Sequence, residues 1–78
     1  MTVAELRKNL GLSLDAFAAK LGLSSRGYAH DIENGTTPSV RVALEIERLS
    51  DGQIDAAELN PDVARVRAAD GGQGEAAA

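Results

Sequence analysis

The chain has 78 residues, the length of one small domain, and carries a formal net charge of −4. It contains no Cys, which excludes disulfides and thiolate zinc sites and suits a reducing cytosol. The apolar residues are mostly Ala and Leu, with one Phe, one Tyr and no Trp, so helices are favoured over sheets. A domain this small buries only about 60% of the surface of its unfolded chain, and we expect a homodimer to add stability.

The negative charge is concentrated in the last third of the chain. Residues 1–50 carry six basic and six acidic residues, whereas residues 51–78 carry two basic and six acidic ones. A neutral N-terminal part can therefore contact a nucleic acid while the acidic part faces away from it. No apolar run approaches the length of a membrane span, and the start lacks the order of a signal peptide. We expect a cytoplasmic, nucleoid-associated protein without membrane contact.

The first two predicted helices are marked by their caps. Thr2 and Glu5 have the spacing of a capping box for a helix over residues 2–10, and Gly11 is a natural stop. Ser13 caps the next helix, which has a stripe of buried residues at helical spacing. That stripe consists of Leu14, Phe17, Ala18 and Leu21. We expect Phe17 at the centre of the core.

A turn centred on Gly22 separates the second helix from a third, which starts at Ser24 or Ser25 and continues to Asn34. Two helices joined so closely cannot lie antiparallel, so they cross steeply and the third is pushed outward. This is the helix-turn-helix arrangement, in which the outer helix can enter a DNA major groove.

A rotation of about 100° per residue sorts the third helix into two faces. With Ile32 inward, Arg26, Gly27, His30 and Asn34 point outward. Arg26 can give two hydrogen bonds to guanine or grip a phosphate, and His30 can do either more weakly. The flanking residue Asp31 can accept from a cytosine amino group or repel phosphate. The predicted base-reading set is Ser25, Arg26, Gly27, Tyr28, His30 and Asp31, in which Tyr28 can alternatively be a core residue.

A fourth helix is predicted from its cap Ser39 to Ser50, and Arg41 in its first turn can hold a phosphate. The predicted phosphate contacts are Lys20, Ser24, Asn34, Thr36 and Arg41. From Gln53 the pattern weakens to a short helical turn and a last helix over residues 61–68 with a narrow apolar edge. That edge is too small to pack in a monomer, so we predict a dimerisation segment over residues 53–68. Its contacts are Ile54, Leu59, Val63 and Val66.

These elements predict an all-α fold, a compact bundle of four to five short helices. The predicted domain covers residues 1–68, with the helix-turn-helix at about residues 13–34. Residues 69–78 have no apolar anchors and are predicted to be a disordered tail.

The segment from Gly11 to about Leu49 resembles the Cro/CI-type (XRE-like) helix-turn-helix family of phage and bacterial repressors. The matching positions are Gly11-Leu12-Ser13, Phe17-Ala18, Lys20-Leu21-Gly22-Leu23-Ser24, Ile32-Glu33-Asn34-Gly35 and Pro38-Ser39. The resemblance implies a lambda-repressor-like DNA-binding domain, with bases read by the start of the third helix and the backbone gripped by the following loop. Carried over by position, it implicates Ser24, Ser25 and Arg26, then His30 or Asp31, and Asn34.

Two departures from the family pattern affect individual contacts. Leu14 stands where the family commonly has a Gln that touches a phosphate. The count from Leu23 to Glu33 is also one residue longer than usual, which leaves Tyr28 either in the core or against DNA.

We therefore expect a sequence-specific, double-stranded-DNA-binding transcriptional regulator, a repressor that binds a palindromic operator as a homodimer. The alternative is a protein-binding module, such as an antitoxin or an adaptor, which the acidic last third favours. We expect no enzyme, no cofactor and no metal. His30, Asp31 and Glu33 lie on different faces of one helix, and there is no second His or Cys to complete a metal shell.

Overall fold

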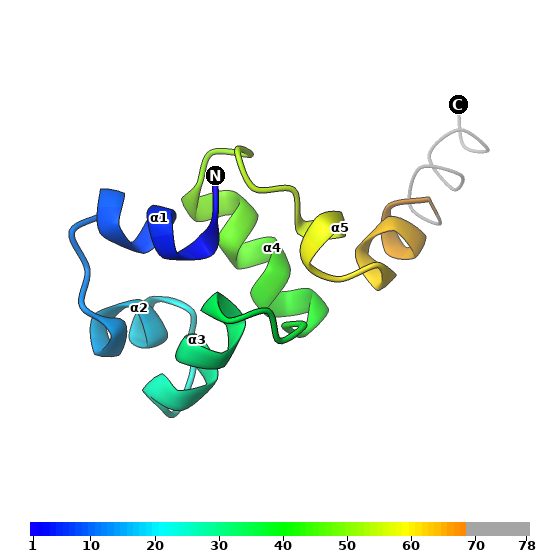
Figure 1. Ribbon diagram of the computed structural model, residues 1–78. Coiled ribbons are helices and arrows are strands. Elements are labelled where there is room, and N and C mark those ends of the chain that lie inside the picture. Colours follow the sequence, from blue (N-terminus) through cyan, green and yellow to red (C-terminus); the bar gives the residue numbers. More distant parts are fainter. Residues whose placement is uncertain (69–78) are drawn as a thin grey trace.

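A computed structural model describes residues 1–68, which form a chain of short helices with no strand (Figure 1). Five of the helices are labelled α1 to α5, and a sixth helical segment spans residues 62–68. The predicted all-α class is confirmed, with six helical segments rather than four to five. The predicted disordered tail, residues 69–78, lies outside the described residues. The five labelled helices are α1 (Val3–Asn9), α2 (Leu14–Lys20), α3 (Arg26–Glu33), α4 (Val40–Leu49) and α5 (Ala56–Leu59).

The helices begin where the caps predict. The capping box is complete, with the Glu5 amide donating to Thr2 Oγ1 and the Thr2 amide donating to the Glu5 carboxylate, each over 3.1 Å. Ser13 Oγ accepts from the Ala16 amide over 3.1 Å, and Ser39 Oγ accepts from the Val42 amide over 3.3 Å. Such caps satisfy amides that have no partner within the helix. Ser25 also occupies a cap position, but its side chain makes no capping hydrogen bond.

The turn between α2 and α3 depends on Gly22. The Gly22 amide donates to the Ala19 carbonyl over 3.0 Å, and the Leu23 amide donates to the Ala18 carbonyl over 2.9 Å. This is the Schellman pattern, which needs a left-handed residue just after the helix, and Gly22 supplies it with a φ of +72°. The pattern ends α2 abruptly, so that α3 can start after only a few residues.

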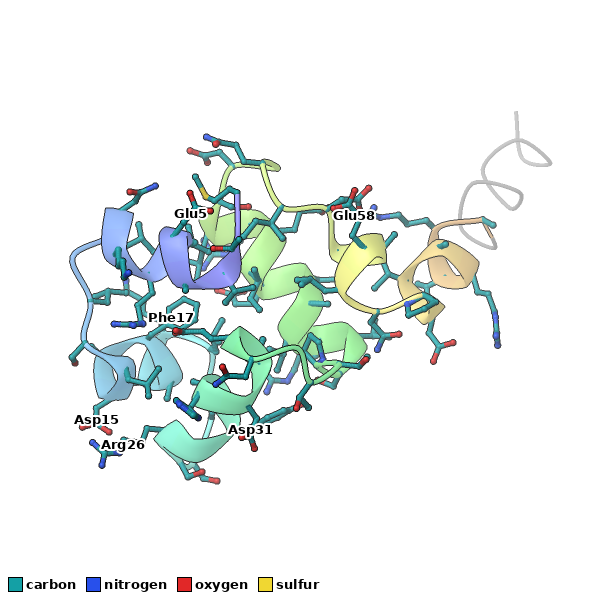
Figure 2. All side chains as sticks on the ribbon, in the orientation of Figure 1. Glu5, Asp15, Phe17, Arg26, Asp31 and Glu58 are labelled. Atoms are coloured by element: carbon teal, nitrogen blue, oxygen red, sulfur yellow. The ribbon has the colours of Figure 1, made fainter. Side chains whose placement is uncertain are left out.

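One core lies between α1, α2, α3 and α4. Phe17 has no exposed surface and lies among the helices (Figure 2), which confirms its predicted place at the centre of the core. The other buried members of this core come from the four helices and their flanking residues and from the loop after α4. They are Val3, Leu6, Ala18, Leu21, Ala29, Ile32, Val42, Ile46 and Ile54.

A second small cluster holds the C-terminal part of the chain against α4. It consists of Ala43, Ala56 and Val63, all without exposed surface. Because Ala43 and Ala56 have small side chains, the Val63 side chain can pack against both of them. The prediction that the edge of residues 61–68 cannot pack in a monomer is therefore wrong.

This packing also corrects two predicted dimer contacts. Ile54 is only 4% exposed and Val63 is fully buried, so both side chains seal the core of their own chain and cannot meet a second copy. Leu59 is half-buried against both clusters. Val66 is the remaining exposed member of the predicted set, at 45%.

Polar contacts join the same segments. Arg67 Nη2 donates to Glu47 Oε1 over 2.6 Å, and Arg67 Nη1 donates to Asp55 Oδ1 over 2.9 Å. Glu47 Oε1 also accepts from the Ala56 amide over 3.1 Å. We call Arg67, Glu47 and Asp55 the C-terminal clasp. Its partners come from α4, from the cap of α5 and from the last helical segment, so it ties the three together.

The clasp predicts an acid-sensitive C-terminal part. The hydrogen bond from Arg67, followed by that from the Ala56 amide, lowers the pKa of Glu47; the Ala57 amide, followed by Arg67, lowers the pKa of Asp55. A carboxylate whose pKa is lowered by folding stabilises the fold above its ordinary pKa, which is 4.5 for Glu47 and 3.8 for Asp55. That contribution is lost as the pH falls through the lowered values.

We expect the urea unfolding midpoint to fall over this acidic window, and to fall less in an Arg67→Ala variant. An equal acid sensitivity with and without Arg67 would contradict this role of the clasp.

Candidate nucleic-acid interface

Helix α3 has one buried face and one exposed face. Ala29 is fully buried and Ile32 is 4% exposed, and both pack into the main core. The side opposite them faces solvent at the edge of the molecule (Figure 1). The division of faces predicted from helical periodicity is therefore confirmed. The exposed residues of this side are Arg26, Gly27, His30, Asp31 and, at the helix end, Asn34.

An ion pair that the sequence analysis did not identify anchors the far end of α3. Arg7 Nε donates to Glu33 Oε2 over 2.7 Å, and Arg7 Nη1 donates to the Leu12 carbonyl over 3.2 Å. The Arg7 and Glu33 side chains are only 22% and 11% exposed. The pair joins α1 to α3. Removal of either partner would leave a partly buried charge without its counterion, which would be destabilising. Twenty-six residues separate the two, and helical periodicity carries no signal over that distance.

The first turn of α3 lies next to the first turn of α2. Arg26 Nη1 is 3.9 Å from Asp15 Oδ2, and the two side chains are 69% and 73% exposed. Figure 2 shows both at the same outer corner of the molecule. Arg26 is thus presented to solvent, as predicted, with a carboxylate beside it.

The second turn of α3 carries His30, Asp31 and Asn34. Asn34 Nδ2 donates to the His30 carbonyl over 2.9 Å and lies 3.3 Å from the imidazole nitrogens. The side-chain amide of Asn34 therefore satisfies the His30 carbonyl at the end of α3, and only its remaining N–H group is free to donate to a phosphate. His30 Nδ1 is 4.0 Å from Asp31 Oδ1, and both side chains are 64% exposed.

Tyr28 lies on the core side of α3. Its ring is half-buried against the main core, and its hydroxyl oxygen accepts from the Ser39 amide over 3.1 Å. Of the two interpretations of Tyr28, the structure supports the core one, because Tyr28 and Ile32 are one helical turn apart. Tyr28 is therefore removed from the set of exposed residues that can face base edges. Its hydroxyl instead accepts a hydrogen bond from the residue that caps α4.

The predicted phosphate contacts differ in how far their side chains are already engaged within the fold. Lys20, Ser24 and Thr36 are exposed. Arg41 Nη1 donates to the Leu21 carbonyl over 3.2 Å, and a Cβ atom at Gly22 would lie 3.3 Å from that nitrogen. Arg41 therefore supports the turn between α2 and α3, with its remaining N–H groups available to a ligand.

The charges around this face are nearly balanced. The exposed bases are Lys20, Arg26 and Arg41, and the exposed acids are Asp15 and Asp31. Among the acidic residues of the C-terminal part that the structure describes, Glu58 on α5 lies well away from Asp15 and Arg26 (Figure 2). The α5 carboxylate of Glu58 therefore does not cover the exposed face of α3.

Within residues 1–68 no cavity was found, and no group of three or more His, Cys, Asp or Glu side chains is placed to hold a metal ion. None of the helices in this part of the chain has the length and apolar character needed to cross a bilayer.

Comparison with known proteins gives one match. The model of a family described as helix-turn-helix (HTH_3) matches residues 3–51, which is more than half of the chain. The match begins with α1 and ends just after α4, so it includes every residue of the exposed face described above. No curated protein and no solved structure matches significantly.

Proposed function

Because the chain belongs to the helix-turn-helix family HTH_3, whose domain implies a DNA-binding regulator, we propose that it is a sequence-specific transcriptional repressor that reads double-stranded DNA. The observation that carries this proposal is the division of α3, whose apolar face is sealed in the core while its polar face is exposed at the edge of the fold. A helix presented in this way can enter the major groove, about 12 Å wide in B-DNA.

The exposed residues divide into two roles. Arg26 and His30 face the base edges from the first and second turns of α3, with Arg26 as the strongest candidate for a bidentate contact to guanine. Ser25 and the bare backbone at Gly27 allow the start of α3 to approach the duplex. The surrounding groups hold the phosphates and fix the orientation of the helix. They are Lys20, Ser24, Asn34, Thr36 and the free part of Arg41.

The proposed active form is a homodimer on a palindromic operator. Two copies of α3 would then lie about 34 Å apart, one turn of DNA. With Ile54 and Val63 buried in their own chain, the exposed Val66 and the outer part of Leu59 are the members of the predicted dimer segment that can meet a second copy. A cytoplasmic, nucleoid-associated location follows from this function.

The salt dependence of binding tests the proposal. Two phosphate-binding bases, Lys20 and Arg41, on each of two protomers release counterions from about four phosphates, so a plot of log affinity against log salt should have a slope of about −3.6. Affinity for a short duplex should then fall about 150-fold between about 50 and 200 mM salt. Fluorescence anisotropy of a labelled duplex measures this directly.

A Lys20→Ala variant should reduce that slope by about two in the dimer, one for each protomer. The alternative function, a protein-binding module such as an antitoxin or adaptor, predicts no such dependence. A duplex affinity that is negligible at low salt, or that does not change with salt, would contradict the DNA-binding proposal.

A further inference from the structure

Asp15 is the unexpected residue at the proposed DNA-facing corner. It lies in the first turn of α2, it is 73% exposed, and its carboxylate is 3.9 Å from the guanidinium of Arg26 (Figure 2). It makes no side-chain hydrogen bond within the described residues. The helix dipole favours a carboxylate in the first turn of α2, but neither the core nor the cap requires one here, since Ser13 already supplies the cap.

A carboxylate in this place has two opposite effects on a DNA-binding surface. Its negative charge disfavours the approach of any phosphate backbone, whatever the sequence. It also attracts the guanidinium of Arg26, a long side chain that otherwise samples many rotamers. The first effect lowers affinity for all duplexes equally, and the second favours the subset of Arg26 positions that lie near the corner between α2 and α3.

We propose that Asp15 is a positioning residue that sets sequence specificity: it orients Arg26 for its base contact, while its negative charge weakens binding to every duplex by a similar factor. This inference rests on the proposed DNA-reading function and names the residue that controls its selectivity. Asp15 does not touch a base in this account. It acts through Arg26, so its effect on selectivity must disappear when Arg26 is absent.

The test compares two duplexes of equal length, the best binder recovered from a random-sequence pool and a scrambled version of it. Asp15→Asn keeps the shape of the side chain and removes its charge. We expect Asp15→Asn to bind the scrambled duplex about twofold more tightly and to lower the ratio of the two affinities by about two- to fivefold, the range for an exposed ion pair. Asp15→Glu, which retains the charge, should restore most of the ratio.

Glu58→Gln is the matched control for charge. Glu58 is also an exposed acid on a helix, but it lies well away from Asp15 and Arg26 (Figure 2). This variant gives the same net charge as Asp15→Asn and should leave the affinity ratio unchanged. Thermal unfolding of each variant confirms that binding is compared between folded proteins.

The decisive comparison is made in an Arg26→Ala background. There Asp15→Asn should still raise affinity for both duplexes, but it should no longer change their ratio. A ratio that Asp15→Asn alters equally with and without Arg26, or does not alter in the wild-type background, would overturn the inference while leaving the proposed function intact. A wild-type protein that does not distinguish any duplex from its scrambled version would overturn the proposed function and the inference together.

Discussion

Replacement of Phe17 by Ala should lower the free energy of unfolding by about 3–5 kcal/mol. Phe17 is fully buried where four helices meet. These helices pack against one another, so they cannot move together to fill the cavity that the truncation leaves. A domain of this size has about 4–12 kcal/mol of stability in total. The variant should therefore lose a large fraction of its total stability, and its urea unfolding midpoint, followed by circular dichroism, should fall accordingly.

Phe17→Leu is the matched comparison, because it keeps most of the apolar volume. It should cost clearly less than Phe17→Ala. A loss below about 1 kcal/mol for Phe17→Ala would be typical of a surface position and would contradict the central place of Phe17 in the core.

Replacement of Arg26 by Ala should weaken binding to the preferred duplex by about 1–3 kcal/mol, which is roughly 5- to 150-fold. The reason is the loss of a guanidinium that the fold presents to solvent at the first turn of α3. The unfolding free energy should change little, because the side chain is 69% exposed. Anisotropy titrations with the preferred and scrambled duplexes measure the effect and its sequence dependence.

Arg65→Ala is the control for the loss of one positive charge. Arg65 is 84% exposed on the last helical segment, where its only described ion pair is with Asp62 over 3.6 Å. This variant should bind the preferred duplex nearly as well as the wild type. If Arg26→Ala and Arg65→Ala had equal effects, Arg26 would contribute only net charge, and its assignment to base readout would be wrong.

Local signals in the sequence predicted much of the fold. The caps at Thr2, Ser13 and Ser39 lie where their spacing indicates, and the turn at Gly22 has the left-handed backbone that it was expected to have. Each of these features is decided within a few residues, so a short window of sequence contains the whole physical cause. The place of Phe17 was predictable for a related reason: it is the only Phe in the chain, and it lies on an apolar helix face.

Features that depend on tertiary contacts were not predictable in this way. The ion pair between Arg7 and Glu33 and the clasp of Arg67 join residues that periodicity does not relate. Val63 was expected to meet a second copy because its own edge is narrow, but two small alanines on other elements create the space it fills.

The candidate site shows the same limit. Helical periodicity correctly identified the exposed face of α3, since it needs only the angle between successive residues. It did not show that the Tyr28 hydroxyl holds the Ser39 amide, or that Arg41 is partly committed to the Leu21 carbonyl. Those side-chain partners belong to other helices, and only the assembled fold brings them within reach.

Selection from a pool of random duplexes, carried out with the folded wild-type protein at near-physiological salt, tests the central claim that the outer face of α3 reads DNA sequence. We expect enrichment of a short motif with two-fold symmetry and half-sites about one helical turn apart. Recovered sequences that are indistinguishable from the starting pool would contradict it.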